Sequence, residues 1–178
     1  IQSAIVNDRV KCMEYANDNM LWVGTFNGVS RLDITTGQIK NFTPAVNPEN
    51  QGWNEVLDLI LIDKEVWIGT NGGGLFHLNR DFNFTQHTDH FNRGANYVNA
   101  LHSFSDSIIW IGSNAGLSAI NANSTAFKKF GSSNYIFPEV NVISIAHDNR
   151  NNLWLGTERS GLIYFNPQSS DFLRINKE

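Results

Sequence analysis

The sequence is poor in cysteine, proline and charge, and each shortage excludes a class of protein. Its 178 residues include a single cysteine, Cys12, so no internal disulfide or multi-cysteine metal cluster can form. Only four prolines interrupt the chain. Lys and Arg number 13 against 17 Asp and Glu, which gives a net charge of −4. This mildly acidic balance excludes nucleic-acid binding that depends on bulk positive charge.

Long apolar runs are missing as well. No stretch approaches the ~18 consecutive apolar residues that a membrane span needs, so we expect no membrane contact from this segment. The chain begins with Ile1 rather than methionine and no signal-peptide pattern follows, so we expect a piece of a longer protein. Hydrophobic residues make up 41% of the chain, which is enough for one packed domain.

The sequence contains one motif that is repeated four times, at intervals of about 44 residues. Each copy has Trp, an apolar residue, Gly, and Thr or Ser, and a second glycine follows a few residues later. The copies begin at Trp22, Trp67, Trp110 and Trp154, their first glycines are Gly24, Gly69, Gly112 and Gly156, and their second glycines are Gly28, Gly74, Gly116 and Gly161. Such agreement across four copies indicates an internal structural repeat.

Each copy predicts four short β-strands joined by polar or glycine-containing turns. We attribute the paired glycines to hairpins, which need a positive φ that glycine adopts at little cost. No segment has a convincing helical periodicity, so the fold class is all-β. Four strands per repeat of this length predict β-propeller blades, each a four-stranded antiparallel sheet with its first strand innermost. The blades are expected at about 8–44, 54–88, 97–131 and 139–176, so that 1–178 forms one partial propeller.

The four tryptophans and the four first glycines are assigned a structural role. A flat indole between two blades covers the neighbouring sheet, and its truncation to alanine should cost about 3–5 kcal/mol of stability. Trp53 differs because it lies outside the repeat column, in the connection between the first two blades.

The repeated string resembles the two-component regulator propeller repeat over nearly the whole chain, from about residue 8 to residue 175. The pattern of Leu-Trp-Ile-Gly-Thr followed by Gly-Leu and an Asp or Asn spans residues 21–33, 66–79, 109–121 and 153–166. The family's upstream Asn-x-apolar element is read as Asn54-Glu55-Val56, Asn99-Ala100-Leu101 and Asn141-Val142-Ile143. The first copy has Asp8 in place of the asparagine.

This resemblance implies a function and a location. Such repeats build the extracytoplasmic, periplasmic sensor of bacterial hybrid two-component systems, commonly as seven-bladed propellers that bind oligosaccharides and regulate carbohydrate use. A membrane span and a histidine kinase follow in such proteins, and neither is present in this sequence. The resemblance therefore implies a ligand-sensing segment without catalysis or cofactor, whose partners are an oligosaccharide and the remaining blades of a larger propeller.

Candidate ligand-binding residues come from the loops expected at the mouth of the propeller channel. Amides, charges and aromatic rings there suit a sugar, whose hydroxyls need hydrogen bonds and whose ring faces stack on aromatics. The set is Trp53, Asn54, Arg93, Tyr97, Tyr135, Glu158 and Arg159.

Metal and catalytic sites have weaker support in the sequence. The string from His87 to His90 has the composition of a metal site, but His87 occupies a strand column, so no metal is expected. Asp58 interrupts an apolar run, but its repeat equivalents are read as Met13, His102 and Ser144, so it has no partner acid. We expect no catalytic residues.

Two other functions remain open: a protein-interaction scaffold and, less favoured, a propeller glycosidase or lyase. For the assembly, we expect four whole blades whose two outer apolar faces exceed what a monomer tolerates. These faces would bury against another copy, which predicts a homodimer.

Overall fold

The structure is a computed structural model. It describes residues 4–16, 18–44, 53–87, 96–105, 107–124, 127–130 and 140–177. The chain divides into two compact units, Ile1–Asp89 and His90–Glu178, and each is described by itself.

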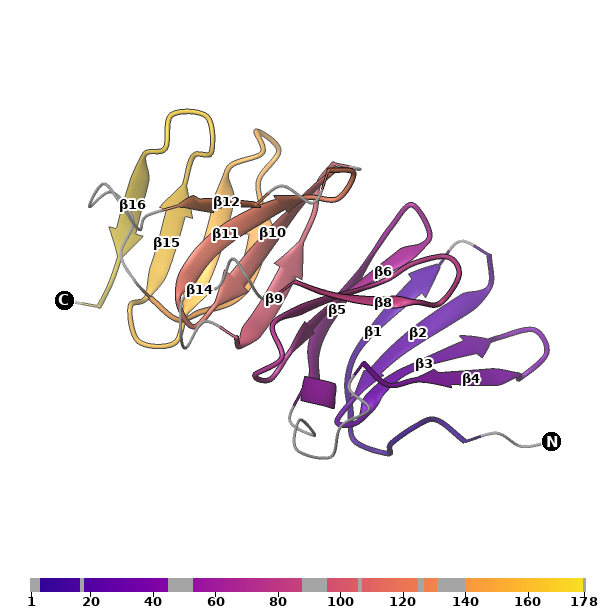
Figure 1. The fold of residues 1–178 in the computed structure, drawn as a ribbon. Helices are drawn as coiled ribbons and strands as arrows, with labels where there is room; N and C mark the ends of the chain where they lie inside the picture. The colour runs from indigo at the N-terminus through magenta and orange to yellow at the C-terminus, as the bar shows by residue number, and fades with distance from the viewer. Residues whose placement is uncertain are drawn as a thin grey trace. The chain divides into compact units, whose positions relative to one another are not determined.

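The first unit contains two four-stranded antiparallel sheets (Figure 1). The first sheet has the order β1-β2-β3-β4, with β1 Val10–Ala16, β2 Met20–Thr25, β3 Gly28–Asp33 and β4 Ile39–Phe42. The second has the order β5-β6-β7-β8, with β5 Val56–Ile62, β6 Glu65–Thr70, β7 Leu75–Leu78 and β8 Phe84–His87. Strands β1 and β5, the first strands of the two sheets, pack against each other.

The second unit repeats this plan. Its sheets have the orders β9-β10-β11-β12 and β13-β14-β15-β16. The strands are β9 Val98–His102, β10 Ile108–Ser113, β11 Gly116–Asn121, β12 Phe127–Phe130, β13 Val142–His147, β14 Leu153–Thr157, β15 Leu162–Phe165 and β16 Phe172–Ile175. Here too the first strands, β9 and β13, pack against each other.

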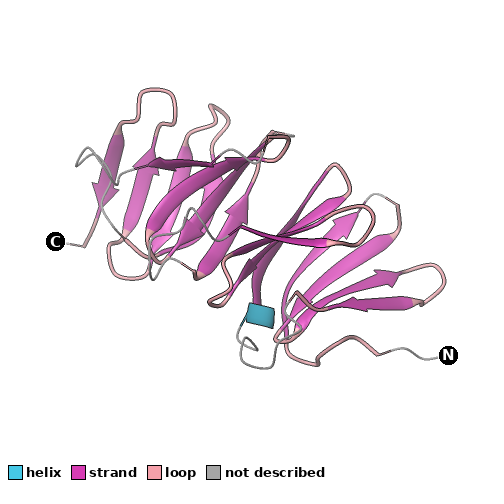
Figure 2. Ribbon diagram, viewed as in Figure 1, coloured by secondary structure: helices cyan, strands magenta, loops and turns pink. Residues whose placement is uncertain are grey.

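The prediction of an all-β fold made of four four-stranded antiparallel repeats is confirmed. In the described part of the chain the helical content is a short 3₁₀ turn at residues 53–54, drawn in cyan in Figure 2. Sheets of consecutive antiparallel strands, each followed by another of the same kind, are the blades of a β-propeller.

The register of the first strands corrects two of the predicted alignments. Val10, Val56, Val98 and Val142 occupy the same position, because they pair with Thr25, Thr70, Ser113 and Thr157. The residues equivalent to Asn54 are therefore Asn96 and Val140, not Asn99 and Asn141. Asparagines crowd this part of each copy, so the sequence alone could not select the right one.

The same register changes the equivalents of Asp58. Asp58 pairs with Gly69 next to a β-bulge, and the matching residues are Cys12, Ala100 and Ser144. Ser144 was predicted correctly, whereas Met13 and His102 lie one and two residues beyond the matching position. The same bulge occurs in all four first strands, so it does not offset the copies from one another. The stretch from this position to the paired glycine is one residue shorter in the second copy, Asp58 to Gly69, than in the first, Cys12 to Gly24, and the sequence alone does not show this difference.

Glycine is required at the two positions of each repeat for different physical reasons. The second ones, such as Gly28 and Gly116, have φ of 115° and 104° and form the predicted tight hairpin turns. The first ones are needed for packing. A Cβ at Gly112 would lie 2.7 Å from Val142 Cγ1 on the first strand of the next blade, and one at Gly24 would lie equally close to Val56 Cγ1. At Gly24 and Gly112 the glycine therefore lets the first strand of the next blade approach, whereas a Cβ at Gly156 would meet Ser144 of its own sheet.

The core of each unit joins its two blades around a tryptophan. Trp22 is 5% exposed and belongs to a cluster with Val56 and Leu59 of the next sheet. Trp110, also 5% exposed, belongs to the corresponding cluster of the second unit, and its ring centroid lies 6.3 Å from that of Phe165. Burial of such rings is the main apolar contribution to the contact between neighbouring blades.

Candidate functional site

One repeated hydrogen bond fixes the loops at the end of the blades where each first strand begins. The backbone N–H of the residue after each second strand donates to the carbonyl of the residue before the first strand. The pairs are Phe26 to Arg9 (3.0 Å), Asn71 to Glu55 (2.9 Å), Asn114 to Tyr97 (3.2 Å) and Glu158 to Asn141 (3.0 Å). The side chains of these loops are thereby held at the same strand end in every blade.

In the first unit these positions form a polar ladder of three side chains. The Lys11 ammonium on β1 lies 2.9 Å from Glu55 Oε1, before β5 of the next blade, and the Asn71 amide donates to Glu55 Oε2. Burial raises the pKa of Glu55, but the hydrogen bonds from Asn71 and Lys11 and the nearby positive charges outweigh it. The pKa of Glu55 therefore lies below its ordinary value, and the carboxylate stays ionised.

The second unit has a ladder at the equivalent positions. Asn99 Nδ2 on β9 donates to Asn141 Oδ1 at 2.7 Å and to the Val142 carbonyl at 2.9 Å. Asn141 Nδ2 in turn donates to Glu158 Oε2 at 3.0 Å. Each ladder joins the first strand of one blade to the loops of the next and presents amide and carboxylate groups at the strand ends.

Two of the predicted ligand-binding residues lie beside the first ladder. Trp53 is half-buried and packs against the Gly72–Gly74 turn, where a Cβ on Gly73 would lie 2.7 Å from Trp53 Cβ. Asn54 is 6% exposed, and its amide donates to Asn27 Oδ1 at 3.5 Å. Asn54 is thus largely taken up by the fold, and Trp53 is the aromatic side chain nearest to this ladder in sequence.

Three more of the predicted ligand-binding residues lie in the second unit, and the remaining two lie outside the described residues. Glu158 belongs to the second ladder, the Arg159 side chain is 88% exposed, and Tyr97 is 46% exposed. Arg93 and Tyr135 lie outside the described residues. Sequence reasoning missed Lys11, Asn99 and Asn141 as site residues, because their roles depend on the register of the first strands.

The candidate acid Asp58 serves its own strand. Its Oδ1 accepts the backbone N–H of Leu59 at 2.9 Å. Burial, with a further contribution from the Asp58 charge, raises the pKa of the Cys12 thiol to about 12. Cys12 therefore remains a protonated thiol and is a poor nucleophile.

The histidine string has no metal-site geometry in its described part. His87 stacks on Trp67 with ring centroids 5.4 Å apart, and Thr88, Asp89 and His90 lie outside the described residues. Among the residues that the structure describes, no three His, Cys, Asp or Glu side chains gather as metal ligands.

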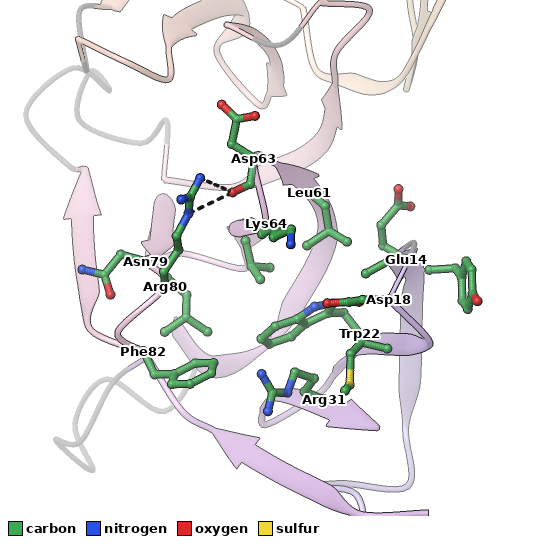
Figure 3. Close-up of a pocket in the computed structure, with 15 residues that line it drawn as sticks. Glu14, Asp18, Trp22, Arg31, Leu61, Asp63, Lys64, Asn79, Arg80 and Phe82 are labelled. Atoms are coloured by element: carbon green, nitrogen blue, oxygen red, sulfur yellow. Dashed lines mark hydrogen bonds between the residues drawn. The ribbon is translucent and has the colours of Figure 1, made fainter. Parts of the chain in front are cut away.

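A cleft that the sequence did not predict lies at the opposite ends of the strands in the first unit (Figure 3). It has a volume of about 800 Å³, and its walls come from both blades. Trp22 and Phe82 are among its lining residues.

Fold and repeat together define the class of protein: a β-propeller built of Trp-x-Gly blades. In the fourth copy, residues 136–159 match the family model of the two component regulator propeller. This match is to the same family that the repeated string resembles. A search of curated proteins finds no match.

Solved structures of similar fold include two extracellular domains and a lyase. One is the extracellular domain of BT3049 from B. thetaiotaomicron, which belongs to a putative hybrid two component system. The match covers 99% of this chain and 23% of the BT3049 chain, with a TM-score of 0.76 and 25% identity. The extracellular domain of BT4673 from the same organism matches with a TM-score of 0.77 and 20% identity, over 96% of this chain and 22% of that one. A streptogramin B lyase matches with a TM-score of 0.75 and 15% identity, over 99% of this chain and 57% of that one.

This chain thus spans less than a quarter of the length of the two extracellular domains. Within the described residues, no helix is long and apolar enough to cross a membrane.

Proposed function

We propose that this chain is a ligand-sensing propeller segment of an extracytoplasmic, periplasmic sensor in a hybrid two-component system that regulates carbohydrate use. The observation that carries the proposal is the pair of polar ladders at equivalent positions of both units, in a chain whose fourth repeat matches the two component regulator propeller. The extracellular domains of similar fold support the location.

The chemistry of the ladders suits an oligosaccharide. Sugar hydroxyls both donate and accept hydrogen bonds, and they match side chains that have carbonyl, amide and carboxylate groups. Asn141 and Glu158 offer such groups in the second unit, and Asn71 and Glu55 offer them in the first. Trp53 and Tyr97 are the aromatic side chains on which a sugar ring would stack.

We infer no catalytic turnover by this segment. Asp58 hydrogen bonds to its own strand and Cys12 is held as a protonated thiol, so neither is prepared for catalysis. The lyase of similar fold is 15% identical to this chain, which supports a shared fold rather than a shared reaction.

Isothermal titration with a panel of oligosaccharides tests the proposal. Saturable heat with one glycan class is expected, weakened about tenfold or more by Asn141→Ala, because the lost amide leaves sugar hydroxyls without partners. Asn83→Ala, in an exposed turn remote from the ladders, is the matched control and should leave binding unchanged. Heat that persists unchanged in Asn141→Ala, or the absence of heat with every glycan, would contradict the proposal.

A further inference from the structure

Within each unit the same contact joins the leading blade to the next one. The first glycine of the leading blade leaves a slot, and two apolar side chains from the first strand of the next blade fill it. The distances from a Cβ placed on the glycine are 2.7 Å to Val56 Cγ1 and 3.1 Å to Leu59 Cδ2 at Gly24, and 2.7 Å to Val142 Cγ1 and 3.4 Å to Ile145 Cδ1 at Gly112. The same three positions therefore make the blade contact in both units.

Gly156 is the equivalent glycine of the last blade. Among the described residues, the atoms within 4 Å of a Cβ there are those of Ser144, on its own sheet. Trp154 of the same strand is half-buried, whereas Trp22 and Trp110 are buried in the cores that they share with the next blade. The slot at Gly156 is thus open on the side where the next blade packs in the other two cases.

The face around this open slot is apolar and exposed. Gly156 pairs with Leu162, and Leu162 pairs with Ile175, so these three residues form one row across the sheet. Leu173 lies in the adjacent row of the same face, where it pairs with Tyr164. The side chains of Leu162, Leu173 and Ile175 are all exposed. An apolar surface of this size favours a protein partner.

The first blade carries the two side chains that would fill such a slot. By the register of the sheets, Val10 and Met13 of β1 are equivalent to the valine and the aliphatic residue that fill the slots at Gly24 and Gly112. In the other three first strands the equivalent valine is buried, but both β1 side chains are exposed. The segment before β1 covers the outer part of this sheet, where the Val6 N–H donates to Ser30 Oγ at 2.9 Å.

We propose that this chain associates head to tail, so that β1 of one copy docks on the last blade of a second copy. Val10 and Met13 enter the slot at Gly156, in the register that joins the blades within each unit. The contact is heterologous, because the two surfaces that meet are different surfaces of the chain. It does not depend on the proposed binding of a saccharide.

Disulfide cross-linking of the full chain tests which surfaces meet. A Cβ at Gly112 would lie 3.2 Å from Val142 Cβ, near the ~3.5–4.5 Å that separates the Cβ atoms of a disulfide. One protein carries Val10→Cys. The other carries Gly156→Cys together with Ser144→Ala, which removes the hydroxyl that the new side chain would meet. A mixture of the two should form a covalent dimer on air oxidation.

Each protein alone should form little covalent dimer, since a head-to-tail contact does not bring two copies of one position together. A mixture of Val10→Cys with Asn83→Cys, in an exposed turn, is the matched control and should give only background. The unchanged protein, in which Cys12 is a protonated thiol, defines that background. No dimer in the mixture of folded proteins, or as much dimer from either protein alone, would overturn the proposal.

Light scattering of a variant with a filled slot tests the same contact without cross-linking. Gly156→Leu together with Ser144→Ala places a side chain where Val10 would enter, and should weaken association about tenfold or more. Ser144→Ala alone is the control and should associate within about twofold of the unchanged protein. Circular dichroism identifies the folded variants, and equal association by the folded filled-slot variant would contradict the proposed register.

Discussion

At the scale of single residues, the repeat is maintained by close packing rather than by turn chemistry alone. The first glycine of the leading blade of each unit leaves the space into which the next blade places a valine, as Gly24 does for Val56 and Gly112 does for Val142. The polar ladders use the neighbouring positions, so packing and polar contacts are specified by adjacent residues of the same strands.

Gly112→Ala should destabilise the second unit by about 1–3 kcal/mol, because the new methyl group would overlap Val142. Val142→Ala should also destabilise, by leaving a cavity. The double variant should lose less stability than the two single losses added together, since each change relieves the other. Urea denaturation of all four proteins measures this coupling, and strict additivity would show that the contact is not the reason for the glycine.

The contact between His102 and His147 should make stability depend on pH. His102 Nε2 and His147 Nδ1 are 2.8 Å apart, and the Phe104 ring lies beside both imidazoles. Burial, and then the nearby His147, lower the pKa of His102 below its ordinary value of 6.5. The neutral form is favoured in the folded state, so this stabilisation is present above pH 6.5 and is lost as the pH falls through the lower folded pKa.

Thermal unfolding between pH 7.5 and pH 5 measures this effect. The melting temperature should fall more steeply with acidification in the unchanged protein than in His102→Gln, which removes the shifted group. His77→Gln is a control that removes a histidine paired with Glu65. Identical pH profiles for the unchanged protein and His102→Gln would disprove the assignment.

At the scale of elements, the unit of packing is a pair of neighbouring blades joined through the first strands and one tryptophan. Trp22 and Trp110 each lie in the core between two sheets, whereas Trp154 is half-buried and has its ring centroid 5.1 Å from that of Tyr164. The same motif therefore contributes differently according to its blade.

Trp110→Ala should cost about 3–5 kcal/mol of stability, because it empties a buried site between two sheets. Trp154→Ala should cost clearly less, since its ring is already half-exposed. The free energies of unfolding of the two variants provide the comparison, and equal losses would contradict this view of the blade contact.

The number, order and type of the sheets could be predicted from the sequence, because the Trp-x-Gly column recurs four times. The alignment of the first strands could not, since the stretch from the first strand to the paired glycine differs in length between copies and asparagines such as Asn96 and Asn99 are close together. The ladder residues Lys11 and Asn141 were missed for the same reason. The cleft was missed because its walls come from two blades, and the sequence alone does not show how the two blades face each other.

At the scale of the whole molecule, exposed apolar side chains lie on the first strand of the first unit and on the last blade of the second. The exposed fractions are 61% for Met13, 53% for Tyr15, 48% for Ile143 and 59% for Leu173. Surfaces of this kind favour association. We propose that further blades of the parent propeller or, for this chain alone, a second copy covers them.

Light scattering at micromolar concentration should therefore give a mass that rises from 20 kDa toward a dimer with concentration. Met13→Glu and Leu173→Glu should shift the protein toward the monomer, since each buries a charge in the contact. A mass of 20 kDa at every concentration would contradict the proposed association.

The central claim is that the polar ladders bind a saccharide. Mapping of amide chemical shifts by NMR tests this claim most directly. On addition of a saccharide that binds, the account predicts shifts centred on Asn71, Asn141 and Glu158. Shifts confined to the cleft around Ala16 and Lys64, or the absence of shifts at Asn71, Asn141 and Glu158, would contradict it.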